Sequence, residues 1–350
     1  MSAPLSANPN PTSFDAGPLG KVYVTGAVTG FALTQDHPVP GDRSSWGDIS
    51  NAQVFVQKTT GPIQFFLQVG AYSLPALGAS YFKASTMTPA TYGVVPQVFV
   101  KFVPSSSFNI MVGKLPTLIG TEYTFTFENT NVQRGLLWNQ ENAVSRGVQA
   151  NYTKGALTVS LSWNDGLYSN EYTWGSALVS YAVTPKDTLS FVALGDYFGH
   201  RSVSTFVTPL LLNNSQIYNT IYTHTDGPWM ISPYFQYTYV PQVPSLGIMH
   251  SASTTGVALL AKYSFSPTFS LGGRGEYISA SGGGVTNLLY GPDSNAWSLT
   301  LTPTFQWKIF YLRGELSYVK ANKVTPSLAF GSLGLDTSQG RALIETGVLF

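Results

Sequence analysis

The sequence predicts an all-β protein, a transmembrane antiparallel up-and-down β-barrel of about 16 strands, with long extracellular loops and short periplasmic turns. Three observations support this fold class. Apolar and polar residues alternate with a period of two along most of the chain. The connections between these segments are short and long in turn. Charged residues make up only 10% of the 350 residues, whereas aromatic residues make up 14%.

The alternation is clearest near residues 294–308. One face there carries Trp297, Leu299, Leu301, Pro303, Phe305 and Trp307, and the other carries Ser298, Thr300, Thr302, Thr304 and Gln306. A strand with these two faces separates an apolar environment from a polar one. Sixteen such strands are predicted, near residues 19–34, 47–57, 62–74, 92–103, 108–117, 146–153, 156–163, 172–183, 188–199, 215–224, 229–240, 254–265, 268–280, 295–307, 310–320 and 341–350.

Seven short connections alternate with eight long ones along the chain. The short ones, such as 154–155 and 225–228, are rich in Gly, Pro, Asp and Ser, which favour tight turns. Strict alternation predicts a meander with all long loops at one end. Outer-membrane barrels have this arrangement and an even strand count, and a bilayer requires the sheet to close because open edges cannot be satisfied in lipid.

The spacing of aromatic residues fits the thickness of a membrane. Trp297 and Trp307 share a face and lie ten residues apart, as do Trp229 and Tyr239. Ten residues of strand span roughly 33 Å, which a tilt near 40° reduces to about 25 Å, the height of the apolar band of such barrels. The alternative is that these rings fill the core of a soluble sandwich, but the opposite faces of the strands are polar.

Other membrane and export signals are absent from the sequence. No stretch approaches 18 consecutive apolar residues, so no transmembrane helix is predicted. No basic segment followed by an apolar core opens the chain, and we expect that a signal peptide has been removed. We assign residues 1–18 to a polar N-terminal lead and residues 19–350 to a single barrel in the outer membrane.

The polar faces of the strands are predicted to line the lumen, since sixteen strands leave a water-filled channel. Strand parity places nine charged residues on this side, six basic and three acidic, which suggests a mild anion preference. Two interpretations stay open, a charged ladder that sets the field across the pore and cross-strand ion pairs that stabilise the wall. The pore-lining residues predicted are Lys101, Lys262, Arg274, Glu276, Arg313, Glu315 and Glu345, with Lys21 and Arg341 on the same parity.

The longest connection, residues 118–145, is predicted to fold into the lumen and narrow it, because loops of this length are usually functional or disordered. The alternative is that it caps the outside with its charges in solvent. Gly113, Pro116 and Gly120 let the chain leave the wall, so that Lys114 and Glu122 could pair across the bend. The charged residues assigned to this constriction loop are Lys114, Glu122, Glu128, Arg134, Glu141 and Arg146.

Several motifs of this region occur together between residues 112 and 166. They are Gly113-Lys114-x-Pro116, Ile119-Gly120-x-Glu122, Asn131-x-x-Arg134, Gly147-Val148 with Tyr152, and Asn164-Asp165-Gly166. In these motifs the chain resembles the OmpL-like β-barrel porin family of Gram-negative bacteria. Outside them the agreement is one of strand pattern and of the terminal Phe350, which resembles the assembly signal of outer-membrane barrels. The resemblance implies an outer-membrane diffusion channel.

A porin passing small hydrophilic solutes or ions by passive diffusion is therefore the expected function, with no cofactor, with lipid as partner, and with a homo-oligomer such as a trimer left open. Two alternatives remain, a plugged barrel acting as a surface adhesin or receptor, and a scaffold for a partner protein. No enzymatic activity is expected, because the four His lack metal-ligand spacing and no nucleophile or phosphate-binding motif occurs.

Overall fold

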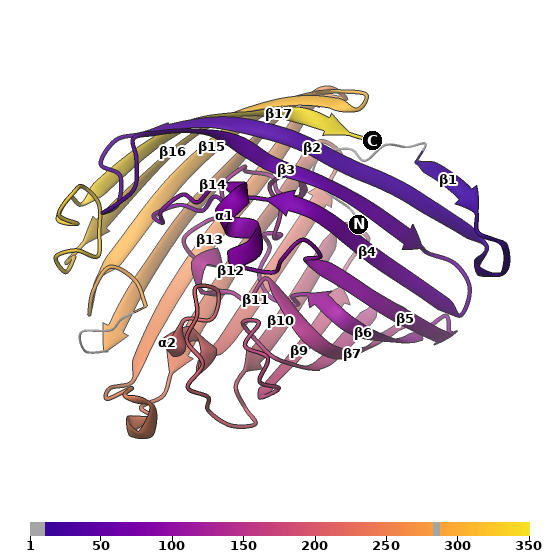
Figure 1. The fold of residues 1–350 in the computed structure, drawn as a ribbon, viewed down its shortest axis with the longest axis horizontal. Helices are drawn as coiled ribbons and strands as arrows, with labels where there is room; N and C mark the ends of the chain where they lie inside the picture. The colour runs from indigo at the N-terminus through magenta and orange to yellow at the C-terminus, as the bar shows by residue number, and fades with distance from the viewer. Residues whose placement is uncertain (1–10, 283–287) are drawn as a thin grey trace.

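The computed structural model describes residues 11–282 and 288–350, which form one closed antiparallel β-barrel (Figure 1). Each strand pairs with its neighbours in the chain, and β17 pairs with β2 to close the sheet. Sixteen long strands build the barrel, which confirms the predicted fold class and strand count.

The long strands are β2 (Lys21–Gln35), β3 (Ser45–Lys58), β4 (Ile63–Tyr72), β5 (Gln97–Ser105), β6 (Phe108–Pro116), β7 (Val144–Lys154), β8 (Leu157–Asn164), β9 (Trp174–Ala182), β10 (Asp187–Gly195), β11 (Gln216–Asp226), β12 (Trp229–Val240), β13 (Ala252–Ser266), β14 (Phe269–Gly282), β15 (Asn295–Trp307), β16 (Phe310–Asn322) and β17 (Ser338–Leu349). Short helices are η1 (Gly17–Leu19), α1 (Ala84–Ala90), η2 (Thr126–Glu128), η3 (Trp138–Gln140), α2 (Leu210–Asn213) and η4 (Pro244–Leu246). Among the described residues, no helix has the length and apolarity to cross a bilayer.

The two ends of the barrel differ as the sequence predicts. In Figure 1 the long loops gather at the left end, with α2 among them, and the short turns lie at the right end near the C-terminus. The polar N-terminal lead, residues 1–18, contains a short strand that was not predicted. Residues 12–15 form a strand, β1 (Thr12–Asp15), which pairs antiparallel with the start of β2. Residues 1–10 of the predicted lead lie outside the described residues.

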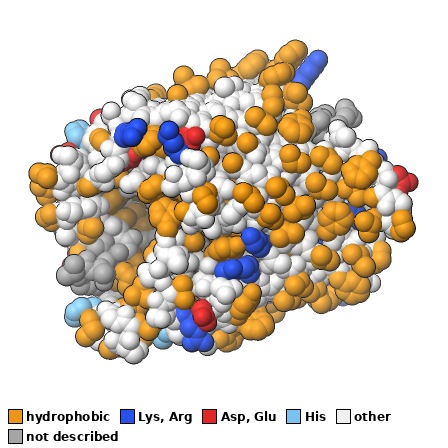
Figure 2. All heavy atoms as spheres, in the orientation of Figure 1, with side chains coloured by type: hydrophobic (Ala, Val, Ile, Leu, Met, Phe, Trp, Pro, Cys, Tyr) orange, Lys and Arg blue, Asp and Glu red, His pale blue; other side chains and the backbone are white. Residues whose placement is uncertain are grey.

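The outer face of the wall is apolar. On β15, Leu299 and Leu301 are 57% and 55% exposed, whereas the intervening Thr300 is only 2% exposed. The same alternation on the neighbouring strands covers the outside with hydrophobic side chains and few charges (Figure 2). An exposed apolar band of this extent has a low free energy only in contact with lipid. The inside–outside parity predicted for this strand is the one that the structure has.

Aromatic side chains gather at both edges of this band. At the end with the short turns, the rings of Trp229 and Tyr263 lie 4.5 Å apart on adjacent strands. At the end with the long loops, the rings of Trp297 and Tyr318 lie 5.5 Å apart. Amphipathic rings at two levels of a barrel wall match the two interfaces of a membrane.

Candidate functional site

The loop between β6 and β7, residues 117–143, folds into the barrel and is buried over most of its length. Its polar groups bond to the inner wall on several sides. The backbone N–H of Gly120 donates to the Oδ1 of Asn219 on β11 over 2.8 Å. The side chain of Asn131 donates to Thr302 on β15 over 2.8 Å, and Asn51 on β3 donates to Thr126 over 2.7 Å. The loop therefore crosses the lumen from wall to wall.

Arg274 on β14 anchors this loop at two places in its sequence, Glu122 and Gln133. Its guanidinium lies 2.5 Å from the Oε1 of Glu122 and 3.2 Å from the Oε2 of Glu276, and it donates to the carbonyl of Gln133 over 2.7 Å. All three charged side chains are at most 5% exposed. The second oxygen of Glu122 accepts the backbone N–H of Gly135 over 2.8 Å. Charge-assisted bonds in a buried setting fix the loop to the wall.

A second anchor lies on β16 and β17. Arg313 and Glu345 face each other across the two strands as a fully buried ion pair. Arg313 also donates to the carbonyl oxygens of Asn129 and Thr126, each over 2.8 Å. Glu315 accepts the backbone N–H groups of two further loop residues, of which Gln133 is at 3.1 Å. The charged side chains of the wall thus bond to the backbone of a loop that, apart from the short helices η2 and η3, has no secondary structure to satisfy its N–H and C=O groups.

The loop between β4 and β5, residues 73–96 with α1, also enters the lumen, which the sequence analysis did not predict. Its Ala76 forms a parallel bridge with Arg134 of the longer loop. Arg341 on β17 donates to the carbonyls of Ala76 and Ala79 over 2.7 and 2.6 Å. The signal available in the sequence was composition, since Leu77 and Tyr81 are apolar residues in a connection and both are buried.

The remaining charges assigned to the constriction loop lie as follows. Glu128 and Glu141 are 3% and 5% exposed, and Arg134 is fully buried with its guanidinium 4.8 Å from the ring of Trp138. Burial raises the pKa of the Glu128 carboxyl to about 7, against the opposing effects of the Phe125 N–H and of Arg134. This loop residue lies outside the spanning strands, and its charge changes near neutral pH.

Lys114 and Arg146 lie on β6 and β7, which flank the loop, rather than in the loop itself. The predicted pairing of Lys114 with Glu122 is wrong. Lys114 donates instead to the carbonyl of Val95 over 2.8 Å, because it lies on the outward-facing parity of β6. Arg146 pairs with Asp165 over 2.6 Å at the external end of the wall.

A cavity of about 800 Å³ lies beside the loop, towards the short-turn end of the barrel. Phe66 of β4 and Phe99 of β5 line one side of it, and β9–β13 line the other. Lys262 on β13 lines the cavity as well, whereas Lys101 lies two residues beyond Phe99 on the same face of β5, outside the lining. Of the charged residues lining this cavity, Glu122 and Glu128 are nearly fully buried and Lys262 is partly exposed.

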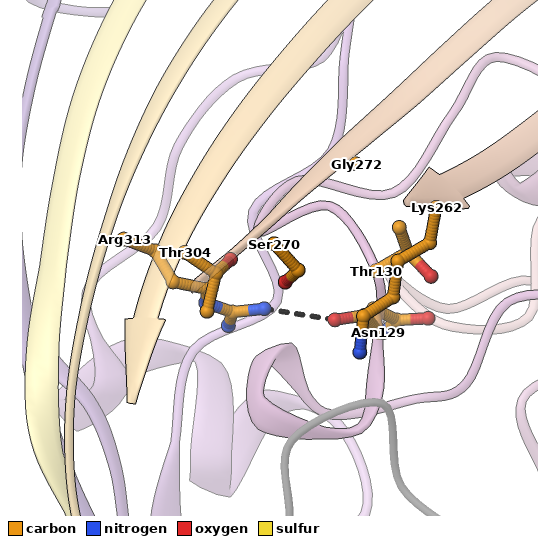
Figure 3. A pocket seen from close by; sticks show the side chains of 7 residues that line it. All are labelled: Asn129, Thr130, Lys262, Ser270, Gly272, Thr304 and Arg313. Carbon is orange, nitrogen blue, oxygen red and sulfur yellow. Dashed lines mark hydrogen bonds between the residues drawn. The ribbon is translucent and has the colours of Figure 1, made fainter. Parts of the chain in front are cut away.

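A smaller cavity adjoins the large one where β13–β16 meet the loop (Figure 3). Its lining includes Lys262, Arg313, Asn129 and Thr130, so two basic side chains approach it from the wall. The bond from Arg313 to Asn129 closes one side, as the dashed line in Figure 3 shows. No group of three or more His, Asp or Glu side chains within residues 11–282 and 288–350 is arranged to hold a metal ion.

Residues 21–350 match the model of the family described as "putative beta-barrel porin-2, OmpL-like". The chain belongs to this family. The match extends over nearly the whole barrel, far beyond the motifs of residues 112–166, and it confirms the resemblance drawn from them. This OmpL-like porin is therefore a multi-pass β-barrel channel of the outer membrane.

Solved structures share the fold of this OmpL-like porin at low sequence identity. The outer-membrane channel DcaP of Acinetobacter baumannii is 9% identical, with a TM-score of 0.65 over 96% of this chain and 99% of its own. An anion-selective porin from Comamonas acidovorans is 12% identical, with a TM-score of 0.62 over 94% and 99% of the two chains. OmpT of Vibrio cholerae is 12% identical, with a TM-score of 0.61 over 97% and 100%. No curated protein matches the chain in sequence.

Proposed function

We propose that this porin is a passive diffusion channel for small hydrophilic solutes or ions with a mild preference for anions. The observation that carries the proposal is the cavity of about 800 Å³ inside the barrel, with Lys262 as the partly exposed charge of its lining. Passive diffusion needs a water-filled path and no cofactor or catalytic group.

The inner loop, close to the predicted span of residues 118–145, acts in this proposal as the constriction. Its anchors on β14 and β16 hold it across the lumen, so a solute passes beside the loop rather than through it. The electrostatic field that a solute meets beside the loop comes from the charged side chains of the wall together with the carboxylates of the loop. In this proposal the predicted pore-lining residues have two roles, since Lys262 lines the cavity that solutes enter while the buried Arg274 and Arg313 hold the loop.

The experiment that tests the proposal is single-channel recording of the refolded protein in a planar bilayer with a KCl gradient. Stable current steps are expected, with a reversal potential whose sign indicates a moderate excess of Cl⁻ over K⁺ permeability. A heat-resistant, fully folded barrel that gives no steps would contradict the channel and favour the plugged barrel that serves as receptor or scaffold. A reversal potential of the opposite sign would contradict only the anion preference.

Assembly is the second part of the proposal. One solved structure that shares the fold, OmpT of Vibrio cholerae, is described in a trimer form. We propose a homo-oligomer, a trimer, embedded in outer-membrane lipid for this porin too. Native mass spectrometry of protein extracted in mild detergent should give a mass three times that of the chain, and a purely monomeric spectrum would contradict the trimer.

The selectivity should depend on pH through Glu128. Its pKa of about 7 means that the carboxyl is mostly neutral at pH 6 and mostly negative at pH 8. Because Glu128 lines the cavity, the added negative charge should lower the Cl⁻ preference as the pH rises. Reversal potentials measured at both pH values in wild type and in Glu128→Gln test this. The variant should show little change with pH, and a full response in the variant would assign the titration to another group such as Glu122.

A further inference from the structure

We propose that the large cavity binds amphipathic anions, small molecules that join an aromatic or aliphatic body to a carboxylate, as they pass through the barrel. The inference rests on the proposed function, because it assumes that solutes reach the cavity through the channel. It names the class of solute for which this lumen is built. A volume of about 800 Å³ lies within the range of roughly 300–1,000 Å³ typical of small-molecule sites.

Apolar side chains line the cavity from both sides of the barrel. Phe66 and Phe99 stack on adjacent strands with their ring centroids 5.5 Å apart. Ile221, Met230 and Leu260 come from β11, β12 and β13. These strands lie six to eight positions around the sixteen-stranded wall from β4 and β5, so the two sets face each other across the lumen.

Apolar residues at inward positions are unusual in a channel for hydrophilic solutes. The inner wall of porins is polar, and the lipid-facing side carries the apolar residues. Here Met230 and Leu260 have inward parity on their strands, two residues from the inward Ser232 and Lys262 respectively. These apolar side chains offer no hydrogen bond to a sugar or an amide, but they lower the free energy of a solute that removes apolar surface from water.

The charges around the cavity favour a negative head group. Glu122 is engaged by Arg274 and by the Gly135 N–H, and Glu128 accepts the Phe125 N–H over 3.2 Å. Both carboxylates are nearly fully buried, at 4% and 3% exposure, whereas Lys262 is partly exposed. Lys262 also lines the small cavity beside Arg313, whose charge is balanced by Glu345, so Lys262 is the charge that a carboxylate in the large cavity would approach (Figure 3).

The test compares three solutes in bilayer recordings of the wild-type channel in KCl. Sodium benzoate has an aromatic body and a carboxylate, sodium acetate lacks the body, and benzamide lacks the charge. Benzoate should reduce the current at a concentration about ten-fold lower than either comparator, since burying a ring and pairing a charge each add to binding. Equal blocking concentrations for benzoate and acetate would overturn the inference while leaving the channel function intact.

Two variants locate the site. Met230→Gln keeps the length of the side chain. It should raise the blocking concentration of benzoate several-fold and leave that of acetate unchanged. Lys262→Gln should raise the blocking concentration of benzoate to nearly that of benzamide. The matched control is Lys101→Gln, which removes a lysine from the same interior but outside the cavity lining, and it should leave the benzoate block unchanged. A block that survives both Met230→Gln and Lys262→Gln would overturn the assignment of the cavity.

A binding measurement keeps the inference testable if the barrel conducts no current. Line broadening of 4-fluorobenzoate in the fluorine NMR spectrum, recorded with the detergent-solubilised full chain, reports binding without transport. Broadening that is lost in Lys262→Gln and Met230→Gln but kept in Lys101→Gln would support the cavity as the site. No broadening with the wild-type chain would overturn it. Failure of conductance and failure of binding are thus separate results.

Discussion

Arg313→Met should lower the free energy of unfolding by about 3–5 kcal/mol, because it leaves the buried Glu345 carboxylate without its counter-ion. Both side chains are fully buried, and Arg313 also satisfies the carbonyls of Asn129 and Thr126 in the inner loop. The variant should therefore also loosen the loop. We expect the urea midpoint to fall, and we expect noisier single-channel currents than those of the wild type.

A double variant and a surface pair supply the controls. Arg313→Met combined with Glu345→Leu removes both charges and should recover much of the lost stability, because no uncompensated charge stays buried. Lys186→Met breaks an ion pair with Asp226 at the short-turn end, where both side chains are about half exposed, and should change the stability little. A stability loss for Arg313→Met no larger than that of Lys186→Met would contradict the anchoring role.

Leu301→Lys should cost about 2–4 kcal/mol of stability in a bilayer, because it places a charge on the lipid face near the midplane. Leu301 is 55% exposed and lies between Trp297 and Trp307 on the outer face of β15. The measurement is reversible urea unfolding of the refolded barrel in lipid vesicles. The expected loss follows from the transfer of an ammonium group into hydrocarbon.

Depth along the strand is the control for this prediction. Phe310→Lys, at the first position of β16 opposite Trp307, lies at the rim and should cost only about 0–1 kcal/mol. Leu301→Met keeps the face apolar and should unfold like the wild type. If Leu301→Lys folds in vesicles without loss, the apolar face of β15 does not contact lipid.

Strands and faces were predictable because their determinants are local. A period of two fixes which side of β15 is apolar, and turn residues such as those at 154–155 mark where a strand reverses. Each long strand begins and ends within five residues of its predicted range, and the largest difference is at β5, which begins at Gln97 rather than at residue 92. In a bilayer, sixteen such strands must form a closed barrel, because the N–H and C=O groups of an open sheet edge would have no hydrogen-bond partners in lipid.

The motif residues that carry the family resemblance are largely structural. A Cβ at Gly113 would lie 2.2 Å from the carbonyl oxygen of Val98, and Gly113 has a φ of +142°, so only glycine fits there. A Cβ at Gly147 would lie 2.2 Å from the carbonyl oxygen of Trp163. These close approaches occur where β5–β8 run into the loops, which explains why the motif identifies the family without indicating a solute.

The inward placement of Arg274, Arg313, Glu315 and Glu345 was predictable from parity, but their partners were not. Arg274 reaches Glu122 across 152 positions of sequence, and Thr126 donates to Glu345 across 219. No local pattern encodes such contacts, since they depend on how a loop without regular structure fills a volume. The alternatives left open for these charges, pore field or wall stabilisation, did not include the anchoring of a loop.

The sequence by itself determined the fold, the strand count, the lipid-facing side and the family, because alternation, turn chemistry and motif glycines act over a few residues. Only the tertiary structure decided what fills the lumen. It placed the loop of residues 73–96 beside the longer loop, buried the wall arginines against loop backbone, and left a cavity near Lys262 with apolar side chains on two opposite sides. The physical reason is that burial and pairing in the interior depend on packing between strands and loops far apart in the chain.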